Sequence, residues 1–201
     1  MKLFEKALLC GIVFATLLSM TRFDARCDGI RDNVLRLHIL ANSDSEEDQA
    51  LKLKVRDRLV KEGSGLFENA RSREEAEALA RENLPRLQAA AQDELRRQGS
   101  DYAVRVEVGQ THFGTRVYED VTLPAGDYEA VRVLIGEAKG KNWWCVMFPA
   151  MCVPAASETG ELSEVLGSDE LDIVEHKDRY EIRFKAVELY EDIKAKIRSW
   201  F

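Results

Sequence analysis

Two cysteines and two tryptophans lie within the segment KNWWCVMFPAMC, from Lys141 to Cys152. Cys145 and Cys152 are seven positions apart, whereas a redox-active thiol pair has the spacing C-x-x-C at a helix N-terminus. A structural zinc site needs four ligands in paired clusters, and this segment holds two cysteines. The spacing therefore favours a structural disulfide, with two free buried thiols as the alternative, over a catalytic thiol.

A disulfide between Cys145 and Cys152 would close a loop of eight residues. Its closure would stabilise the fold by about 2–3 kcal/mol, provided that the turn at Phe148-Pro149 brings the two Cα atoms together. Disulfides persist outside the reducing cytoplasm, so this pairing depends on export. Cys10 lies in an N-terminal apolar run and Cys27 follows it, which leaves Cys145 and Cys152 as the natural pair.

The two tryptophans, Trp143 and Trp144, are neighbours in an expected strand over residues 142–148. Successive side chains of a strand point to opposite faces, so at most one of them can join the core beneath the sheet. The other one packs under a loop or a terminal helix, or it projects as an anchor for a protein partner. The sequence leaves both interpretations open.

A second group of polar residues, His38, Asn42, Asp44, Glu47 and Asp48, follows the expected strand over residues 34–40. The end of a strand that leads into a helix often holds an active site. However, these carboxylates belong to the first helical turn, where they offset the helix dipole, and no second histidine lies at ligand spacing. We therefore expect helix capping or a partner surface here, ahead of a metal or catalytic site.

Composition and missing motifs narrow the class of protein further. The chain of 201 residues has a formal net charge of −7 and no basic stripe that could neutralise a phosphate backbone, so we expect no nucleic-acid partner. It has no glycine-rich phosphate loop, nucleophile elbow or H-E-x-x-H motif. We therefore expect a protein that is not an enzyme and that binds neither a cofactor nor a metal ion.

The N-terminus predicts export. Lys2 and Lys6 precede an uncharged run over residues 7–20, and charge resumes at Arg22. As a helix this run would rise about 21 Å, short of the roughly 30 Å hydrocarbon core, which suits a signal sequence better than a stable span. We expect residues 1–26 to be a signal peptide, or an anchor in contact with the membrane if uncleaved. Residues 27–201 would then form a single extracytoplasmic α+β domain.

The apolar periodicity predicts the elements that position these groups. A capped helix from about residue 45 should end at Gly63-Ser64-Gly65, and Pro85 should kink or restart a second helical region that opens at Ser72. Turns are expected at Gly109-Gln110 and over residues 124–127. Strands are expected over residues 34–40, 102–108, 115–121, 131–135 and 142–148.

The C-terminal part is expected to be irregular over residues 155–178 and helical from about Glu181. That helix should dock on the sheet through one apolar side, formed by Ala186, Leu189, Tyr190, Ile193, Ile197 and Trp200. The order of elements predicts an α+β fold with a largely antiparallel sheet and helices packed on it. The N-terminal signal or anchor segment would lie outside this fold.

Two segments together resemble the stage II sporulation protein R family of endospore-forming bacteria. They are LRLHILANSDSEEDQALKLKVRD, residues 35–57, and PAGDYEAVRVLIGEAKGKNWWCVMFPAMC, residues 124–152. The combination of ANSD with GKNWWC and a following FP carries the resemblance. Their order and spacing also fit the family.

The resemblance implies a signalling protein that is made in the forespore and exported into the space between the two sporulation membranes. There it would activate a membrane-embedded aspartic protease of the mother cell, which would process the precursor of an early sigma factor, sigma-E. We expect the partner surface to comprise His38, Asn42, Asp44, Asn142, Trp143 and Trp144. The alternative is a secreted cell-wall hydrolase that acts around His38 and Asp44, and a third class is a structural tether held by an uncleaved N-terminus.

Overall fold

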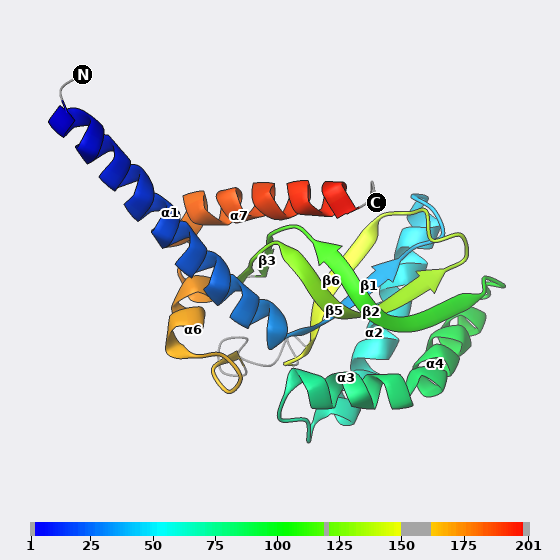
Figure 1. Ribbon diagram of the computed structural model, residues 1–201. Coiled ribbons are helices and arrows are strands. Elements are labelled where there is room, and N and C mark those ends of the chain that lie inside the picture. Colours follow the sequence, from blue (N-terminus) through cyan, green and yellow to red (C-terminus); the bar gives the residue numbers. More distant parts are fainter. Residues whose placement is uncertain (1–2, 119–120, 150–161, 199–201) are drawn as a thin grey trace. The chain divides into compact units, whose positions relative to one another are not determined.

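The computed structural model describes residues 3–118, 121–149 and 162–198 (Figure 1). Helices and strands follow one another in the order α1 (Leu3–Asp32), β1 (Leu35–Leu40), α2 (Glu46–Phe67), α3 (Arg73–Glu82), α4 (Leu84–Arg97), β2 (Val104–Phe113), β3 (Arg116–Tyr118), β4 (Val121–Leu123), β5 (Gly126–Ile135), β6 (Asn142–Phe148), α6 (Ser168–Glu175) and α7 (Lys177–Arg198).

The main sheet has four strands in the order β2-β5-β1-β6. β1 pairs in parallel with β5 and antiparallel with β6, and the short strands β3 and β4 form a separate antiparallel pair. The predicted α+β class with a mostly antiparallel sheet is confirmed. The parallel pair at the centre arises because three helices, α2 to α4, lie in the chain between β1 and the remaining strands.

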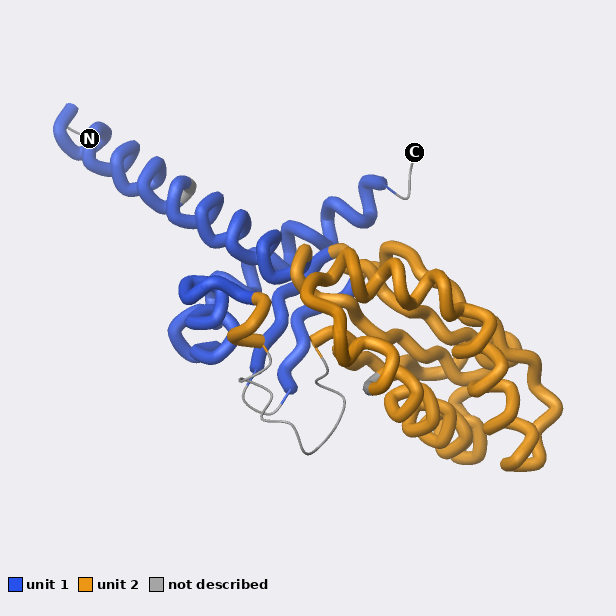
Figure 2. Tube along the Cα trace, turned by 90° about the horizontal axis from the view of Figure 1, so that it is seen from below, with its two compact units in different colours: residues 1–31, 113–126, 166–201 blue, residues 32–112, 127–165 orange. Residues whose placement is uncertain are grey.

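The chain divides into two compact units (Figure 2). Unit 1 comprises residues 1–31, 113–126 and 166–201, and unit 2 comprises residues 32–112 and 127–165. The expected division between residues 26 and 27 falls inside α1, which continues without a break to Asp32. Whether the first 26 residues form a separate segment stays a prediction.

Unit 2 contains the main hydrophobic core, between one face of the sheet and the helices α2, α3 and α4. Along β1, Leu35, Leu37 and Ile39 belong to this core and are fully buried. The alternation of strand side chains places Arg36 and His38 on the other face of the sheet. The register of β1 therefore decides which side of the sheet carries the polar residues.

The glycines of α2 do not end the helix, so the predicted stop at Gly63-Ser64-Gly65 is wrong. α2 continues to Phe67, whose side chain is buried in the core. A Cβ at Gly63 would lie 2.9 Å from the Cε atom of Met147 in β6. Glycine at this position therefore allows a close approach between helix and sheet.

The predicted helix starts are confirmed at two serines. The side chain of Ser45 accepts a hydrogen bond from the backbone N–H of Asp48, and that of Ser72 accepts one from Glu75. The restart at Pro85 is also confirmed, since α3 ends at Glu82 and α4 carries Pro85 in its first turn. The two capped helix starts and the restart at Pro85 therefore follow local rules of capping and proline placement that can be applied to the sequence alone.

Two strand predictions need correction. The expected turn at Gly109-Gln110 is wrong, because β2 continues through both residues to Phe113 beside β5, which is equally long. The weaker strand expected over residues 115–121 is two short strands, β3 and β4. The bend over residues 124–127 is shorter than expected, since β5 begins at Gly126.

Residues 162–178 are more regular than expected, because they include α6 and the start of α7, which begins at Lys177. The first turn of α6 is fixed by the Glu170 side chain, whose Oε2 accepts a hydrogen bond of 2.9 Å from the N–H of Gly167. The rest of the expected irregular segment, from Ala155 to residue 161, lies outside the described residues.

The predicted inner face of α7 is wrong. The buried residues are Phe184, Val187 and Glu191, whereas Ala186, Leu189, Tyr190, Ile193 and Ile197 are exposed, and Trp200 lies outside the described residues. Phe23 of α1 decides which side packs, because its ring contacts Tyr180 at 5.5 Å and Phe184 at 5.6 Å between centroids. Within unit 1, α7 therefore packs on α1.

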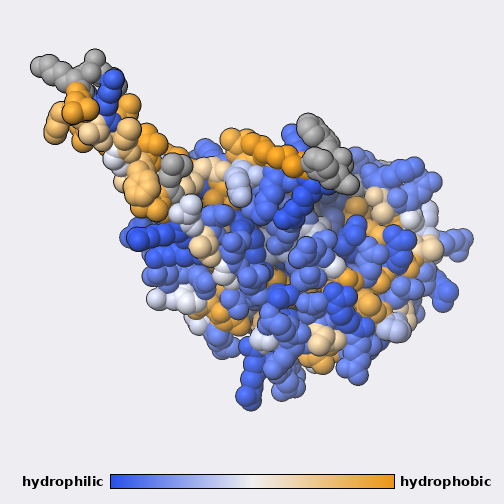
Figure 3. Space-filling model, viewed as in Figure 1, coloured by the Kyte–Doolittle hydropathy of each residue, from blue (hydrophilic) through white to orange (hydrophobic). Residues whose placement is uncertain are grey.

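The helix α1 has two different halves. Phe23, Cys27 and Ile30 in the second half are buried, whereas the first half exposes Leu3, Phe4, Leu8, Leu9, Ile12, Val13, Phe14 and Leu18. Figure 3 shows the N-terminal end of this helix as a largely orange, hydrophobic surface. Within the described residues, α1 is the one helix that is long and apolar enough to cross a membrane. Its N-terminal position and apolar surface are those of a signal sequence or a membrane anchor.

Candidate functional site

The six residues expected to contact a partner all belong to unit 2, on β1, β6 and the loop after β1, and we call them the β1–β6 patch: His38, Asn42, Asp44, Asn142, Trp143 and Trp144. In the register of β1 and β6, His38 is opposite Trp144 and Leu40 is opposite Asn142. β6 is an edge strand of the sheet. The two sequence segments that carry the family resemblance thus meet at one sheet edge.

Backbone contacts hold the loop after β1 against the loop before β6. The Asp44 Oδ1 accepts a hydrogen bond of 2.6 Å from the N–H of Lys141. The Asn42 Oδ1 accepts one of 3.0 Å from the N–H of Glu137, and its backbone carbonyl accepts one of 3.2 Å from Lys139. Asn42 and Asp44 therefore connect the two loops as well as belonging to the patch.

Two glycines make this contact sterically feasible. Gly136 has a φ of +57°, and a Cβ there would collide with the side-chain oxygen of Asn42. A Cβ at Gly140 would collide with the backbone carbonyl oxygen of Ser43. The spacing of these glycines before Lys141 is therefore part of the site, although the sequence alone gives no reason to single them out.

The neighbouring carboxylate of Asp48 is a structural group. It is buried and accepts hydrogen bonds from the Ser43 hydroxyl and, at 2.9 Å, from the Asn42 side-chain amide. The hydrogen bond from Ser43, followed by that from Asn42, lowers the pKa of Asp48 against the opposing effect of burial. Asp48 thus orders the start of α2 and orients Asn42.

The two tryptophans take different sides of the sheet, as the strand geometry predicts. Trp143 is half-buried and packs against the hydrophobic core of unit 2. The guanidinium of Arg56 on α2 lies 4.4 Å from the centroid of its ring, a cation–π contact. Trp143 therefore has a packing role, and Arg56 is a residue of the site that carries no motif in the sequence.

Trp144 lies on the opposite side and stacks on His38, with ring centroids 6.1 Å apart and an interplanar angle of 19°. His38 is 7% exposed. Burial lowers the pKa of His38, and the nearby positive charges of Arg132 and Arg36 lower it further, against the effect of Asn142. The ring is accordingly neutral at neutral pH.

Lys52, which lies outside the predicted patch, supports the same loops. The Nζ of Lys52 on α2 donates hydrogen bonds to the backbone carbonyl of Lys141 at 2.9 Å and to Gln49 at 2.6 Å. Burial lowers the pKa of Lys52, while the carboxylate of Asp44 opposes this shift. The Nε2 of Gln49 in turn donates a hydrogen bond of 2.8 Å to the backbone carbonyl of Ser43, so α2 fixes the ends of both loops.

Cys145 is buried on the core side of β6, opposite Leu37, and is disulfide-bonded. Cys152, its expected partner, lies outside the described residues, so the pairing of these two residues stays a prediction. Cys10 and Cys27 carry free thiols, the former exposed and the latter buried.

The β1–β6 patch holds the kinds of side chain that a protein-binding surface uses. It offers a stacked aromatic pair, two amides and one exposed carboxylate, and backbone N–H groups fix the side chains of Asn42 and Asp44. Aromatic side chains are typical anchors in protein interfaces. Over residues 3–118, 121–149 and 162–198, no group of three or more His, Cys, Asp or Glu side chains could hold a metal ion.

Comparisons with known proteins point to one family. Residues 31–158 match the family of stage II sporulation protein R, and this range contains all six residues of the patch. A protein of Bacillus subtilis (strain 168) described as stage II sporulation protein R is 40% identical over 123 residues. That alignment covers 61% of this chain and 55% of the relative, so the chain spans about half the length of the curated relative it matches.

No solved structure matches the chain. The sequence match alone covers more than half of its residues, and it includes both loops and the paired strands of the patch. The resemblance carried by the ANSD and GKNWWC segments is thereby confirmed. The chain belongs to the stage II sporulation protein R family.

Proposed function

We propose that this protein is an exported signal that activates a membrane-embedded aspartic protease of the mother cell across the intermembrane space. The protease would then process the sigma-E precursor. Family membership supports a role in sporulation, and the apolar half of α1 is compatible with export. The observation that carries the proposal is that the matched residues bring His38, Asn142 and Trp144 together at one sheet edge.

An activator of this kind works by binding. It shifts its partner toward the active state only as far as it binds that state more tightly than the idle one. A preformed surface loses little conformational entropy on binding, which strengthens its binding to the partner state that it fits. The hydrogen bonds that fix Asn42 and Asp44 supply that rigidity in the β1–β6 patch.

The direct test mixes the full chain with the reconstituted protease and the sigma-E precursor in proteoliposomes. Cleavage of the precursor should rise with the dose of the added protein and should stop when the catalytic aspartates of the protease are replaced. Arg105→Ala is a matched control, because Arg105 is exposed on β2, at the opposite edge of the same sheet. Unchanged cleavage over a wide range of doses would rule out activation.

The hydrolase alternative gains no support from the surroundings of His38. The ring is 7% exposed and stacks on Trp144, so a wall polymer has little access to it. Incubation of the purified chain with peptidoglycan separates the two functions, because an activator releases no soluble fragments. Release of fragments that His38→Gln abolishes would instead establish the hydrolase.

A further inference from the structure

The helix α7 exposes an apolar stripe that unit 1 leaves uncovered. Ile182 is 84% exposed, Leu189 63%, Ile193 49% and Ile197 50%. With Ala186, which is also exposed, these residues recur at intervals of three or four and therefore lie on one side of the helix. Single exposed apolar residues are ordinary, but a continuous stripe of this length marks an interaction surface.

The stripe is separate from the side of α7 that packs. Tyr180 and Phe184 contact Phe23 of α1, and Val187 is buried in the same row. Ile182 lies two positions from Phe184, about 200° around the helix axis. α7 therefore has two apolar sides, one used within unit 1 and one turned to its surroundings.

The charges beside the stripe favour an anionic surface. α7 contains seven basic and five acidic side chains, in a chain whose net charge is −7. Arg183 and Lys194 lie on one border of the stripe, and Lys185 and Lys196 lie on the other together with Asp178 and Asp192, as the helical spacing requires. Lys185 and Lys194 form ion pairs with Glu181 and Glu191 of the same helix, and α7 as a whole keeps an excess of two basic side chains. Apolar stripes bordered by lysine and arginine are typical of helices that lie in the interface of a membrane.

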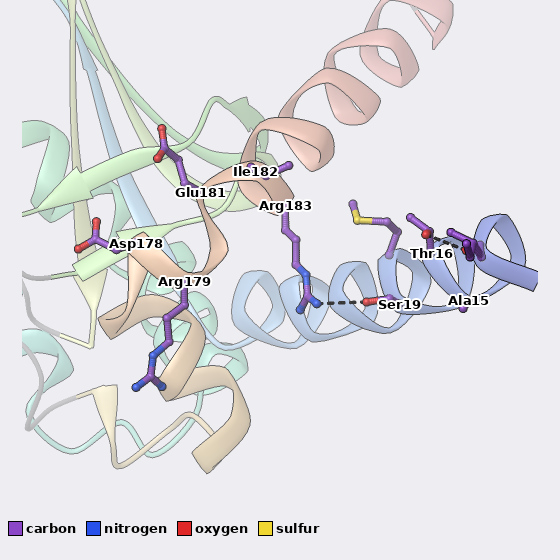
Figure 4. A pocket seen from close by; sticks show the side chains of 10 residues that line it. Ala15, Thr16, Ser19, Asp178, Arg179, Glu181, Ile182 and Arg183 are labelled. Carbon is purple, nitrogen blue, oxygen red and sulfur yellow. Dashed lines mark hydrogen bonds between the residues drawn. The ribbon is translucent and has the colours of Figure 1, made fainter. Parts of the chain in front are cut away.

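The neighbour of the stripe is the apolar part of α1. An open groove of about 710 Å³ lies between α1 and the first turns of α7, and Ile12, Met20 and Ile182 all line it. The Nη2 of Arg183 donates a hydrogen bond of 3.2 Å to the Ser19 Oγ (Figure 4). This contact holds the start of α7 at the end of the uncharged run, where a membrane-inserted α1 would leave the hydrocarbon.

We propose that α7 is a membrane-surface helix whose stripe inserts into the headgroup region of a bilayer that contains anionic lipids. Its apolar residues would be buried about 5–10 Å deep, with the bordering cations on lipid phosphates. α7 lies outside residues 31–158, so this role goes beyond what the family match covers. The proposal does not depend on the protease partner, but it requires that α1 stays attached.

The test places a fluorescent label at chosen positions of the full chain and measures how deeply each label lies in the bilayer. An environment-sensitive dye is attached to Ile193→Cys or Ile182→Cys, in a Cys10→Ser background because Cys10 carries an exposed free thiol. The protein is reconstituted in vesicles of phosphatidylglycerol and phosphatidylcholine with brominated acyl chains. Lys54→Cys, at an exposed position of α2, is the matched control.

Both stripe labels should shift to the blue and lose most of their fluorescence to the brominated lipids, whereas the label at position 54 should do neither. Adding Leu189→Glu and Lys185→Glu should abolish quenching at position 182 while circular dichroism stays unchanged, because both altered side chains are exposed. A stripe label that stays in water would overturn the proposal. So would a blue shift without quenching, or one that rises with protein concentration in the absence of lipid, because a protein surface would then cover the stripe.

Discussion

Trp144 of β6 stacks on His38 of β1, and the two residues are direct partners in the antiparallel register of these strands. They lie more than a hundred positions apart in the sequence. The pair joins the two segments that carry the family resemblance, and a preformed aromatic pair of this kind suits an interface anchor. Its contribution to activation and its effect on stability can be measured separately.

Replacing Trp144 by alanine should reduce protease activation at least tenfold, about 1.4 kcal/mol of binding free energy, because the stacked ring is lost from the proposed surface. The reconstituted cleavage assay measures this loss, and circular dichroism checks the fold. Trp144→Phe keeps an aromatic ring on His38 and should retain most of the activation. Full activation by the alanine variant would exclude the β1–β6 patch as the partner surface.

Replacing Trp143 should act on stability instead. Its ring packs against the core beside Arg56, so Trp143→Ala should lower the free energy of unfolding by about 2 kcal/mol, less than for a fully buried tryptophan. Arg56→Ala should cost about 0.5–1 kcal/mol through the lost cation–π contact. Urea denaturation measures both values. Equal stability of Trp143→Ala and the wild type would mean that the ring does not pack in solution.

Acidification should destabilise the protein through His38. Burial and the charges of Arg132 and Arg36 lower its pKa in the folded state below the ordinary value of 6.5. As the pH falls through about 6.5, the unfolded chain therefore binds a proton that the folded protein does not, and the free energy of unfolding decreases. His38 thus contributes fully above this pH and progressively less below it.

Denaturation of the wild type and His38→Gln at about pH 7.5 and pH 5.5 checks this prediction. The variant should lose the part of the pH dependence that His38 causes. The lowered pKa of Asp48 acts separately, because its stabilisation is present above the unfolded pKa near 3.8 and is lost only as the pH falls below that value. Identical pH slopes for the two proteins would show that His38 titrates alike in both states.

A methyl group at Gly140 should separate the two loops of the site. Its Cβ would collide with the carbonyl oxygen of Ser43, and backbone cannot move aside as a flexible side chain can. Gly140→Ala should therefore lower the free energy of unfolding by about 2–4 kcal/mol, a magnitude typical of steric strain inside a packed site. Gly109→Ala is the control, since no atom lies within 4 Å of its added Cβ. Similar stabilities of the two variants would contradict the close contact.

The disulfide prediction is tested by peptide mapping without reduction. Cys145 and Cys152 should appear in one linked peptide, and only Cys10 and Cys27 should react with an alkylating agent in the unfolded protein. Cys152→Ser should then cost about 2–3 kcal/mol of stability, the value for a short closed loop. Alkylation of all four cysteines would show that the thiols are free.

The elements that depend on local rules could be predicted from the sequence, and those that depend on distant contacts could not. The strand over Asn142–Phe148 and the caps at Ser45 and Ser72 appear where the pattern puts them. The role of Gly63 depends on Met147, which is 84 positions away. No local pattern contains that information, so the local sequence predicts a helix stop at this glycine.

The prediction of which side of α7 packs failed for another physical reason. The helix has two apolar sides, and hydrophobicity alone selected the one with Leu189 and Ile193, which is exposed. Phe23, from the opposite end of the chain, determines which side packs. In the candidate site, the pairing of β1 with β6 brings His38 to Trp144, and the sequence could name both residues but not their contact.

The contact of Phe23 with Tyr180 and Phe184 also bears on processing by signal peptidase. A cut near Ala25 would take Phe23 away with the leader and leave both rings of α7 without their partner. Proteolytic maturation would then do more than shorten the polypeptide, since it would expose a second apolar side of the C-terminal helix. The helix that has the composition of a signal sequence or anchor is thus also a piece of the folded architecture, and its removal would create a different molecule.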